Sequence, residues 1–344
     1  MSRIAVVGAT GAVGQVMLET LDARGLGAPE HEIVPFASER SAGRVLDNGM
    51  TVVALADDTI EGFDLAIFSA GGSVSGEWAP RFAAAGAVVI DNSSRWRMDP
   101  EVPLVVAEVN PGALDAHKGI VANPNCSTMQ LMVALKPIHA AVGIERLVVS
   151  TYQSVSGTGV AAVEELRTQQ RAILAGEPVP DPEIYPAVIA DNVIGAAGNF
   201  PEGDDSTDEE RNMMFETRKI LGDDSIGISV TCARVPVPYS HSEAVNVQTR
   251  EPLSAADARA LLEGAPGIAV VDDPRTHAHP SARAAAGRDE VFVGRIRDDA
   301  SHPRALNLWV VSDNLRKGAA TNAVQIAELL HERGLIGGRA TSVA

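Results

Sequence analysis

The stretch Ile4-Ala5-Val6-Val7-Gly8-Ala9-Thr10-Gly11-Ala12-Val13-Gly14 decides the fold of the N-terminal half. A short β-branched run enters a glycine turn, and residues 16–21 then continue with a helical pattern. Strand, glycine turn and helix are typical of a dinucleotide-binding opening, because glycines allow positive φ and let the backbone approach a pyrophosphate at the helix N-terminus. The spacing is G-x-x-G-x-x-G, and purely structural glycine turns are common. The stretch therefore favours cofactor binding without proving it.

Strand and helix patterns continue to alternate through the first half of the chain. Apolar strand patterns lie at 32–36, 65–69 and 87–90, and a helical pattern lies at 77–85. This alternation is the doubly wound α/β pattern, built on a parallel sheet.

The end of the second predicted strand bears on which nucleotide is bound. NAD-preferring enzymes place a carboxylate there for the ribose 2′-OH, whereas an arginine with hydroxyls suits a 2′-phosphate. Arg40 and Ser41 favour NADP. The alternative is a solvated loop in which Glu39 is a misplaced ribose acid.

The chain is long enough for a second domain, because single cores stop growing near roughly 250 to 300 residues and this chain has 344. Strand patterns at 146–154, 226–237, 244–249, 291–296 and 306–312 dominate the second half. We therefore expect an α/β protein with a Rossmann-like N-terminal domain and an α+β domain around a mixed or antiparallel sheet. The expected boundaries are 1–125, completed by a C-terminal helical segment 313–344, for the first domain and 126–312 for the second.

Composition excludes several functional classes. Lys and Arg number 28 against 45 Asp and Glu, a formal net charge of −17, so nucleic acid and anionic membrane are poor partners. The apolar runs are too short to span a membrane. Two cysteines do not form a disulfide framework, which favours the cytoplasm. Nothing in the sequence indicates a metal site.

Cys126 lies where an apolar strand-like run, 119–122, gives way to a helical pattern that starts near Ser127. A thiol at a helix N-terminus is stabilised as the thiolate by the helix dipole. A buried structural cysteine beside an ordinary helix cap is the alternative.

Polar residues of the second half give Cys126 candidate partners. Arg234 and His241 stand at opposite ends of a short turn, so both can reach one pocket. A helix predicted from Thr207 to Leu221 begins with a capping box of Thr207 and Glu210. Glu209 and Asn212 share one face of this helix, although such a face is usually solvated.

Seven motifs, in order and over nearly the whole chain, resemble the aspartate-β-semialdehyde dehydrogenase family. They are Gly8 to Gly14, Ser38 to Gly43, Asn123 to Thr128, Gln153 to Gly157, Arg234 to Val237, His241, and Asp313 to Ala320. The resemblance implies NADPH-dependent reductive dephosphorylation of aspartyl-β-phosphate to aspartate semialdehyde, in lysine, threonine and methionine synthesis. It also implies a homodimer or homotetramer whose partners are its small-molecule substrate and phosphate.

The resemblance further assigns roles to individual residues. Cys126 corresponds to the nucleophile that forms an acyl-thioester, His241 to the acid/base partner and Gln153 to a residue that orients the substrate. Arg234 corresponds to the group that grips the substrate α-carboxylate, Glu209 to the acid that holds its amino group, and Arg97 to a phosphate-binding arginine. The implied cofactor contacts are the glycine turn with Gly8, Thr10, Gly11, Ala12 and Val13, then Arg40 and Ser41 at the 2′-phosphate, Ser156 and Gly157 near the nicotinamide, and Asn314 at the carboxamide.

One position departs from the family pattern. Asn212 stands where the family has a lysine that helps to bind phosphate. An amide brings no charge, so phosphate affinity should fall unless Arg211 or another cation compensates, and a shifted substrate is the other interpretation.

Two alternatives accompany this assignment. N-acetylglutamyl-phosphate reductase shares the opening turn and the cysteine chemistry, but Glu209 facing a free ammonium argues against it. A non-catalytic NADP-sensing protein would need neither the nucleophile nor its partners, and those residues are all present.

Overall fold

The computed structural model describes residues 2–27 and 29–336, and the chain divides into two compact units. The first unit comprises residues 1–125 and 319–344, and the second comprises Cys126–Gly318. Of the segment 313–344 expected in the first domain, residues 313–318 therefore lie in the second unit, and 337–344 lie outside the described residues.

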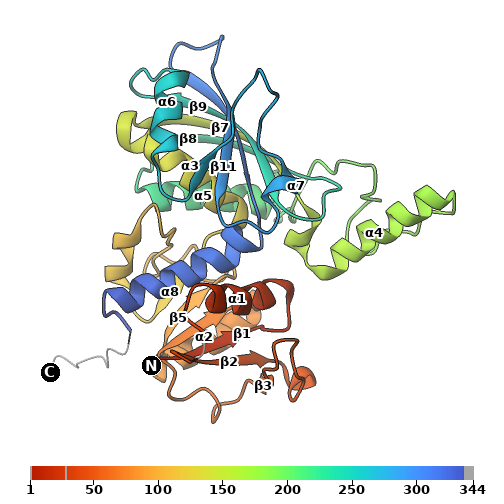
Figure 1. Ribbon diagram of the computed structural model, residues 1–344, viewed down its shortest axis with the longest axis vertical. Helices are drawn as coiled ribbons and strands as arrows, with labels where there is room; N and C mark the ends of the chain where they lie inside the picture. The colour runs from red at the N-terminus through yellow and green to blue at the C-terminus, as the bar shows by residue number, and fades with distance from the viewer. Residues whose placement is uncertain (1, 28, 337–344) are drawn as a thin grey trace. The chain divides into compact units, whose positions relative to one another are not determined.

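The first unit is built on a parallel sheet of six strands in the order β3-β2-β1-β4-β5-β6 (Figure 1). Its elements are β1 (Arg3–Val7), α1 (Ala12–Ala23), β2 (Glu32–Ala37), η1 (Glu39–Ser41), β3 (Val53–Ala54), β4 (Leu65–Phe68), α2 (Gly72–Ala84), β5 (Val88–Asp91), η2 (Pro111–Ala116), β6 (Ile120–Ala122) and α8 (Asn322–Glu332). The order reverses direction after β1, which confirms the predicted Rossmann-like doubly wound fold.

Alternate residues along the strands of this sheet pack into two separate hydrophobic cores, one on each face. Ile4 and Val6 of β1 pack in a cluster with α1 and α8, whereas Ala5 and Val7 pack in a cluster with α2. Period-two alternation with both faces buried makes each strand a continuous apolar run. The last described helix of the chain thus completes the core that its first strand begins.

One helix boundary was predicted wrongly. The helical pattern predicted a start at residue 77, but α2 begins at Gly72, with Gly71 in extended conformation as its N-cap. Gly71 and Gly72 thus form the helix entry itself. A glycine is acceptable at an N-cap because the residue there is not helical.

The second unit is built on a mixed six-stranded sheet in the order β10-β11-β12-β9-β7-β8. The β7/β8 and β10/β11 pairs are parallel and the others antiparallel. Its elements are α3 (Cys126–Val142), β7 (Ile144–Gln153), η3 (Val155–Thr158), α4 (Val160–Ala175), α5 (Asp208–Leu221), β8 (Gly227–Arg234), β9 (His241–Thr249), α6 (Ala255–Glu263), β10 (Ile268–Val270), α7 (Ala282–Ala285), β11 (Val291–Asp298) and β12 (Ala305–Ser312). A π-helical segment, η4 (Arg316–Thr321), follows β12.

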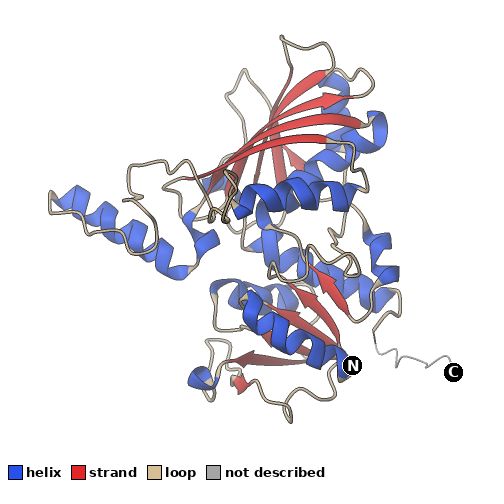
Figure 2. Cartoon of the chain, turned by 180° about the vertical axis from the view of Figure 1, so that it is seen from behind, coloured by secondary structure: helices blue, strands red, loops and turns tan. Residues whose placement is uncertain are grey.

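Helices α3, α5 and α6 contact one face of this sheet, as the colours in Figure 2 help to follow. Alternation along the strands separates the two faces: on β7, Leu147, Val149 and Thr151 are buried, whereas Arg146 and Tyr152 are exposed. The second face of the sheet therefore remains partly open in the single chain.

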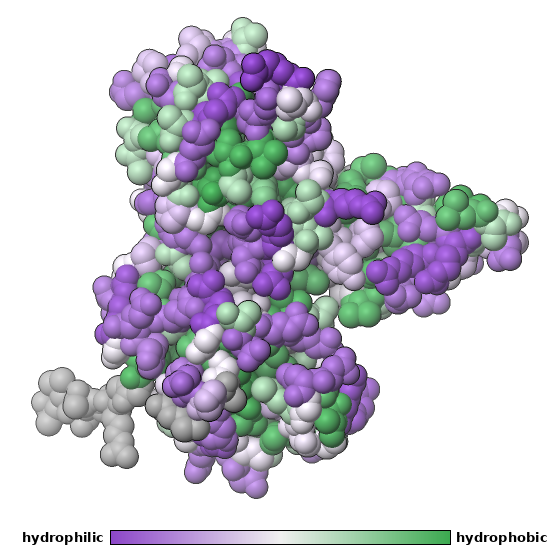
Figure 3. All heavy atoms as spheres, in the orientation of Figure 1, coloured by the Kyte–Doolittle hydropathy of each residue, from purple (hydrophilic) through white to green (hydrophobic). Residues whose placement is uncertain are grey.

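The segment 176–206 is a long loop, and its one β-bridge pairs Ile194 with Arg234. Before it, α4 extends away from the sheet, and Leu174 near its C-terminal end is 88% exposed; Figure 3 shows hydrophobic residues at the tip of this helix. After it, α5 begins with the predicted capping box of Thr207 and Glu210. Among the described residues, no helix is long and apolar enough to cross a membrane.

Candidate active site

Cys126 and His241 face each other in the second unit. Cys126 is the first residue of α3 and His241 the first of β9, and Sγ lies 3.2 Å from Nε2 of the imidazole. The N-terminal end of a helix favours a negative charge on the thiol. The sulfur is partly accessible, whereas His241 is fully buried. This is the geometry of a nucleophile with an adjacent proton-handling group.

Backbone contacts define which nitrogen of His241 carries the proton. The N–H of Ser154 donates to Nδ1 over 3.0 Å. An N–H can only donate, so Nδ1 is unprotonated and the neutral ring carries its hydrogen on Nε2, toward Cys126. Burial and the nearby Arg234 guanidinium lower the pKa of His241 well below its ordinary value. The neutral imidazole at this site is therefore a hydrogen-bond donor toward the sulfur.

A buried hydroxyl and amide network holds Ser154 in place. Its Oγ contacts Nδ1 of His241 at 3.1 Å and donates to Oδ1 of Asn314 over 3.0 Å. Oδ1 of Asn314 also accepts from the backbone N–H of Ser240, and Nδ2 of Asn314 donates to Ser156. Asn314 and Ser156, two of the expected cofactor contacts, thus stand directly behind the histidine.

Arg234 is tied to the same segment. Its Nη1 donates to the carbonyl of Ser154 over 2.8 Å, and Nε is buried without a hydrogen-bond partner in the described residues. A Cβ on Gly157 would lie 3.3 Å from both Arg234 Nη1 and His241 Nε2. Glycine is thus what allows the backbone at 157 to pass this close to both groups.

Gln153 and Glu209 form a second polar pair, with Nε2 of the amide donating to Oε1 of the carboxylate over 2.9 Å. Gln153 ends β7 and Glu209 lies in the first turn of α5. Asn212, half-buried, follows Glu209 by almost one helical turn. Arg211 projects from another side of α5 and pairs with Asp204 at 3.5 Å.

Gly318 brings the segment after β12 against the nucleophile. A Cβ at position 318 would lie 2.9 Å from Cβ of Cys126, closer than real side chains pack. The motif that contains Asn314 therefore lies beside the thiol only because residue 318 has no side chain.

Arg97 is placed in the first unit. It is almost fully buried, and its Nε and Nη2 donate to the carbonyls of Asn123 and Asn92 at 3.0 and 2.7 Å. Asn123 precedes Cys126 by three residues, so Arg97 braces the strand-to-helix connection that delivers the cysteine.

The glycine turn of the first unit fits a pyrophosphate. Gly8 has φ +86°, and a Cβ there would collide with the carbonyl of Ser69. Gly11 caps α1 without any side-chain hydrogen bond, so no side chain competes for the first N–H groups of the helix. Thr10, Ala12 and Val13 complete a short turn at the positive end of the helix dipole, where phosphate oxygens bind.

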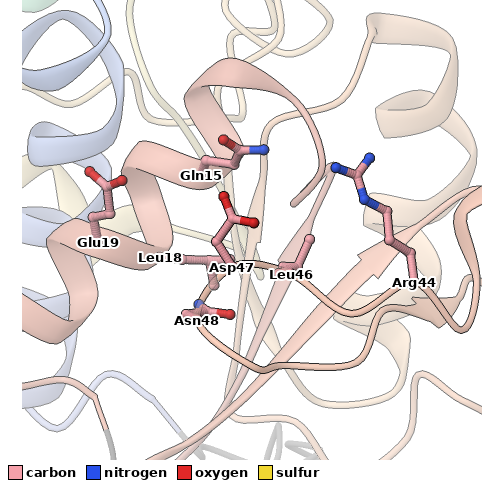
Figure 4. Close-up of a pocket in the computed structure, with 7 residues that line it drawn as sticks. All are labelled: Gln15, Leu18, Glu19, Arg44, Leu46, Asp47 and Asn48. Carbon is pink, nitrogen blue, oxygen red and sulfur yellow. The ribbon is translucent and has the colours of Figure 1, made fainter.

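Arg40 and Ser41 lie in η1, directly after β2. Arg40 is exposed, and within the described chain its guanidinium has no hydrogen-bond or ion-pair partner. A pocket nearby is lined by Gln15, Leu18 and Glu19 of α1 and by four residues of the 44–48 turn, Arg44 among them (Figure 4). Its lining includes none of the cofactor candidates.

Two polar residues of the second unit escaped the sequence analysis. Ser154 lies inside a quoted motif, but its role depends on a contact with His241, 87 residues away. Glu243, two residues after His241, is fully buried although it is a carboxylic acid. The sequence signal that could have identified Glu243 is the alternation of side chains along a strand, because a residue two positions after His241 lies on the same inward face.

Two family models match most of the chain. One, described as semialdehyde dehydrogenase, NAD binding domain, matches residues 3–117. The other, described as semialdehyde dehydrogenase, dimerisation domain, matches residues 135–317.

Relatives and solved structures agree with these matches over almost the full length. The chain is 53% identical to an aspartate-semialdehyde dehydrogenase of Aquifex aeolicus, over 97% of this chain and 99% of the relative. It is similar to the crystal structure of aspartate semialdehyde dehydrogenase II from Vibrio cholerae complexed with ASA, with a TM-score of 0.91, 48% identity, and 96% and 98% of the two chains covered. It is also similar to a Candida albicans aspartate semialdehyde dehydrogenase with NADP, with a TM-score of 0.74, 26% identity, and coverage of 98% and 100%.

Proposed function

Because the chain belongs to the aspartate-semialdehyde dehydrogenase family, we propose that it reduces L-aspartyl-4-phosphate to L-aspartate 4-semialdehyde with NADPH, through an acyl-thioester on Cys126. The reaction serves lysine, threonine and methionine biosynthesis. The observation that carries the proposal is the 3.2 Å approach of Cys126 Sγ to the Nε2–H of a neutral, fully buried His241.

Cys126 opens the reaction as a thiolate. Sγ attacks the acyl carbon, the bond from that carbon to the phosphate oxygen breaks, and inorganic phosphate leaves with the electron pair. When bound, NADPH supplies the hydride that the thioester carbonyl carbon accepts. The resulting tetrahedral oxyanion then re-forms its carbonyl, and the carbon–sulfur bond breaks to release the aldehyde and the Cys126 thiolate.

His241 acts as a hydrogen-bond donor both before the thiolate attacks and in the later tetrahedral states. Its Nε2–H stabilises the thiolate before attack and the negative oxygen of the tetrahedral states. Arg234 binds the substrate α-carboxylate, Glu209 the amino group, and Gln153 orients the reacting carbonyl. Arg97 and Asn212 contribute to phosphate binding.

In this proposal the cofactor contacts fall into two groups of residues. Gly8, Thr10, Gly11, Ala12 and Val13 bind the pyrophosphate, and Arg40 with Ser41 binds the 2′-phosphate that distinguishes NADP from NAD. Ser156, Gly157 and Asn314 serve the nicotinamide side. The first unit is accordingly the NADP-binding domain and the second the catalytic and dimerisation domain.

The partly open sheet face of the second unit supports a homodimer or homotetramer. Tyr152 of β7 and Trp309 of β12 contact each other on that face, with ring centroids 5.4 Å apart and ring planes tilted by 48°, and Tyr152 is 39% exposed. Aromatic side chains on an uncovered face are typical of protein interfaces. Two free thiols suit a reducing cytoplasm.

The test is a spectrophotometric assay of the reverse reaction, with purified protein, aspartate semialdehyde, phosphate and either NADP or NAD. The wild type should reduce NADP only when both other substrates are present, and Cys126→Ala should lose at least about 10³-fold in kcat. Cys232→Ala tests whether loss of any thiol lowers activity, and it should cost far less than Cys126→Ala because that thiol packs against Met213 and not against His241. Activity that survives in Cys126→Ala would exclude the thioester route, and turnover of N-acetylglutamate semialdehyde instead would reassign the substrate.

A further inference from the structure

A layer of buried polar side chains lies directly behind the catalytic candidates of the second unit. On β7, Thr151 lies two residues before Gln153, and on β8, Cys232 lies two residues before Arg234. On β9, Glu243 lies two residues after His241. The two residues of each pair share the inward face of their strand. The strand register pairs Thr151 with both Cys232 and Glu243, so the three are neighbours across β8, β7 and β9. Gln130 of α3 and Ser312 of β12 complete what we call the polar layer.

Gln130 connects this layer to the nucleophile. It lies four residues after Cys126, on the same side of α3. Its Oε1 accepts a hydrogen bond from Ser312 Oγ over 2.7 Å, and Ser312 is the register partner of His241 on the adjacent strand. On its other side Gln130 neighbours the Glu243 carboxyl, where its amide partly offsets the rise in pKa that burial causes.

Glu243 lies at the centre of the layer, in surroundings that disfavour a carboxylate anion. It is fully buried, and neither carboxyl oxygen has a hydrogen-bond or cationic partner in the described chain. Burial raises its pKa well above the ordinary value, and the Glu209 carboxylate adds to the shift. A carboxyl group in this setting keeps its proton. Nε2 of Gln130 and Oγ1 of Thr151 are also buried without partners, so complementary groups surround the acid.

Resting on the function proposed above, we propose that Glu243, as a neutral carboxylic acid, is a positioning residue for the cysteine and histidine. Its carboxyl group, packed among the polar layer, fixes the first turns of α3 against β9 and so sets the approach of Cys126 to His241. Neutrality is required, because an anion two residues from His241 would disfavour the thiolate. The charged or titratable groups near the Glu243 carboxyl are Glu209 of α5, Cys232 of β8 and His241 itself.

Two substitutions separate hydrogen bonding from charge. Glu243→Gln keeps size and polarity without a titratable proton, so kcat should stay within about threefold. The pH midpoint of Cys126 alkylation by iodoacetamide should also stay in place. Glu243→Met fills a similar volume without hydrogen bonds, and it should lower kcat at least about tenfold with KM nearly unchanged. Its thermal midpoint should not fall, because replacing a buried polar group by an apolar one of similar shape is close to neutral in stability.

These outcomes can overturn the proposal in three ways. A downward shift of the alkylation midpoint by one pH unit or more in Glu243→Gln would show that the wild type carries a charge there. Glu243→Met with wild-type kcat would exclude a positioning role, and a parallel loss of kcat and melting temperature would make the residue merely structural. Glu251→Gln, an exposed residue just after β9, is the matched control.

A spectroscopic readout makes the test independent of turnover. The infrared difference spectrum between wild type and Glu243→Gln at neutral pH should contain the carbonyl stretch of a protonated carboxyl group. A carboxylate band instead would refute the neutral acid. Because neither infrared spectra nor Cys126 alkylation requires catalysis, a failure of the proposed dehydrogenase activity would be recognised separately, as an inactive wild type.

Discussion

The backbone N–H of Ser154 donates to Nδ1 of His241 over 3.0 Å, while Nε2 of the same ring lies 3.2 Å from Sγ of Cys126. A backbone donor cannot be titrated or rotated away. The imidazole is therefore held with its hydrogen toward the sulfur, whatever the side chain at position 154.

Ser154→Ala should consequently be mild, with a loss of kcat below about tenfold, because the backbone N–H remains and only the neutral hydrogen bonds of one hydroxyl are removed. His241→Asn should lose about 10²–10⁴-fold, the usual worth of a positioned acid or base. Steady-state kinetics of both variants at one pH measure the contrast. Equal losses would mean that the hydroxyl, and not the backbone, fixes the tautomer.

Gly157→Ala should lower kcat/KM by about tenfold or more, because the added Cβ would stand 3.3 Å from both Arg234 Nη1 and His241 Nε2. Gly195→Ala is the matched control, since nothing lies within 4 Å of its Cβ position. Comparing the two by kinetics and thermal unfolding separates crowding of the site from a general cost of losing glycine. Unchanged kinetics in Gly157→Ala would show that the site tolerates the displacement.

Arg40→Ala should raise the KM for NADP at least about tenfold and leave the KM for NAD unchanged, because its exposed guanidinium is free to pair with a 2′-phosphate. Arg44→Ala, an exposed arginine in the neighbouring turn, should change neither constant. If wild type used NAD as well as NADP, the assignment of Arg40 would fail, and Glu39 would be the next residue to substitute.

Asn212→Lys should lower the KM for phosphate in the oxidative direction by about three- to tenfold, since a cation replaces a neutral amide at the proposed phosphate site. Arg211→Ala tests the other source of charge, and its pairing with Asp204 leads us to expect little effect. An unchanged KM in Asn212→Lys would mean that another cation already neutralises the phosphate.

The stability difference between Glu243→Gln and wild type should grow with pH. Because the pKa of Glu243 is raised above its ordinary value of 4.5, the folded chain holds a proton that the unfolded chain releases, so wild type loses stability as pH rises above 4.5. The difference in unfolding free energy should widen by up to about 1.4 kcal/mol per pH unit until the folded-state pKa of Glu243 is reached.

His241 has the opposite linkage, because its pKa is lowered and its contribution to stability is lost as pH falls below 6.5. That contribution is common to both proteins and cancels. Urea unfolding over a range of pH tests the slope, and a constant gap would contradict it.

Local sequence patterns were sufficient for much of the fold. The glycine turn, the alternation of β1 and the capping box of α5 are short-range features, and each predicted its element correctly. The start of α2 was missed because Gly71 and Gly72 indicate a loop as readily as a helix entry. Short pieces such as β3 and β10 were missed because two or three residues carry no periodicity.

The site was predictable only where a motif marked it. Cys126 and His241 could be paired by resemblance, and their contact spans 115 residues. The roles of Ser154 and Glu243 depend on strand register and on burial from several elements at once, neither of which is a property of a local stretch. The roles assigned to Arg97, Asn212 and the cofactor contacts remain predictions for the experiments above.

The position of α8 in the first unit has a consequence for how the chain is made. Ala323, Val324 and Leu330 of this helix belong to the core that β1 and α1 begin, and Asn322 bonds to Asn123 and Val105 across 199 and 217 residues. A ribosome adding about 5–20 residues per second needs roughly 10 to 40 s to cover that separation. During that interval the nascent N-terminal half exposes the apolar surface that α8 later covers, which makes it a natural client for chaperones. The second unit is contiguous in sequence and is free to fold first.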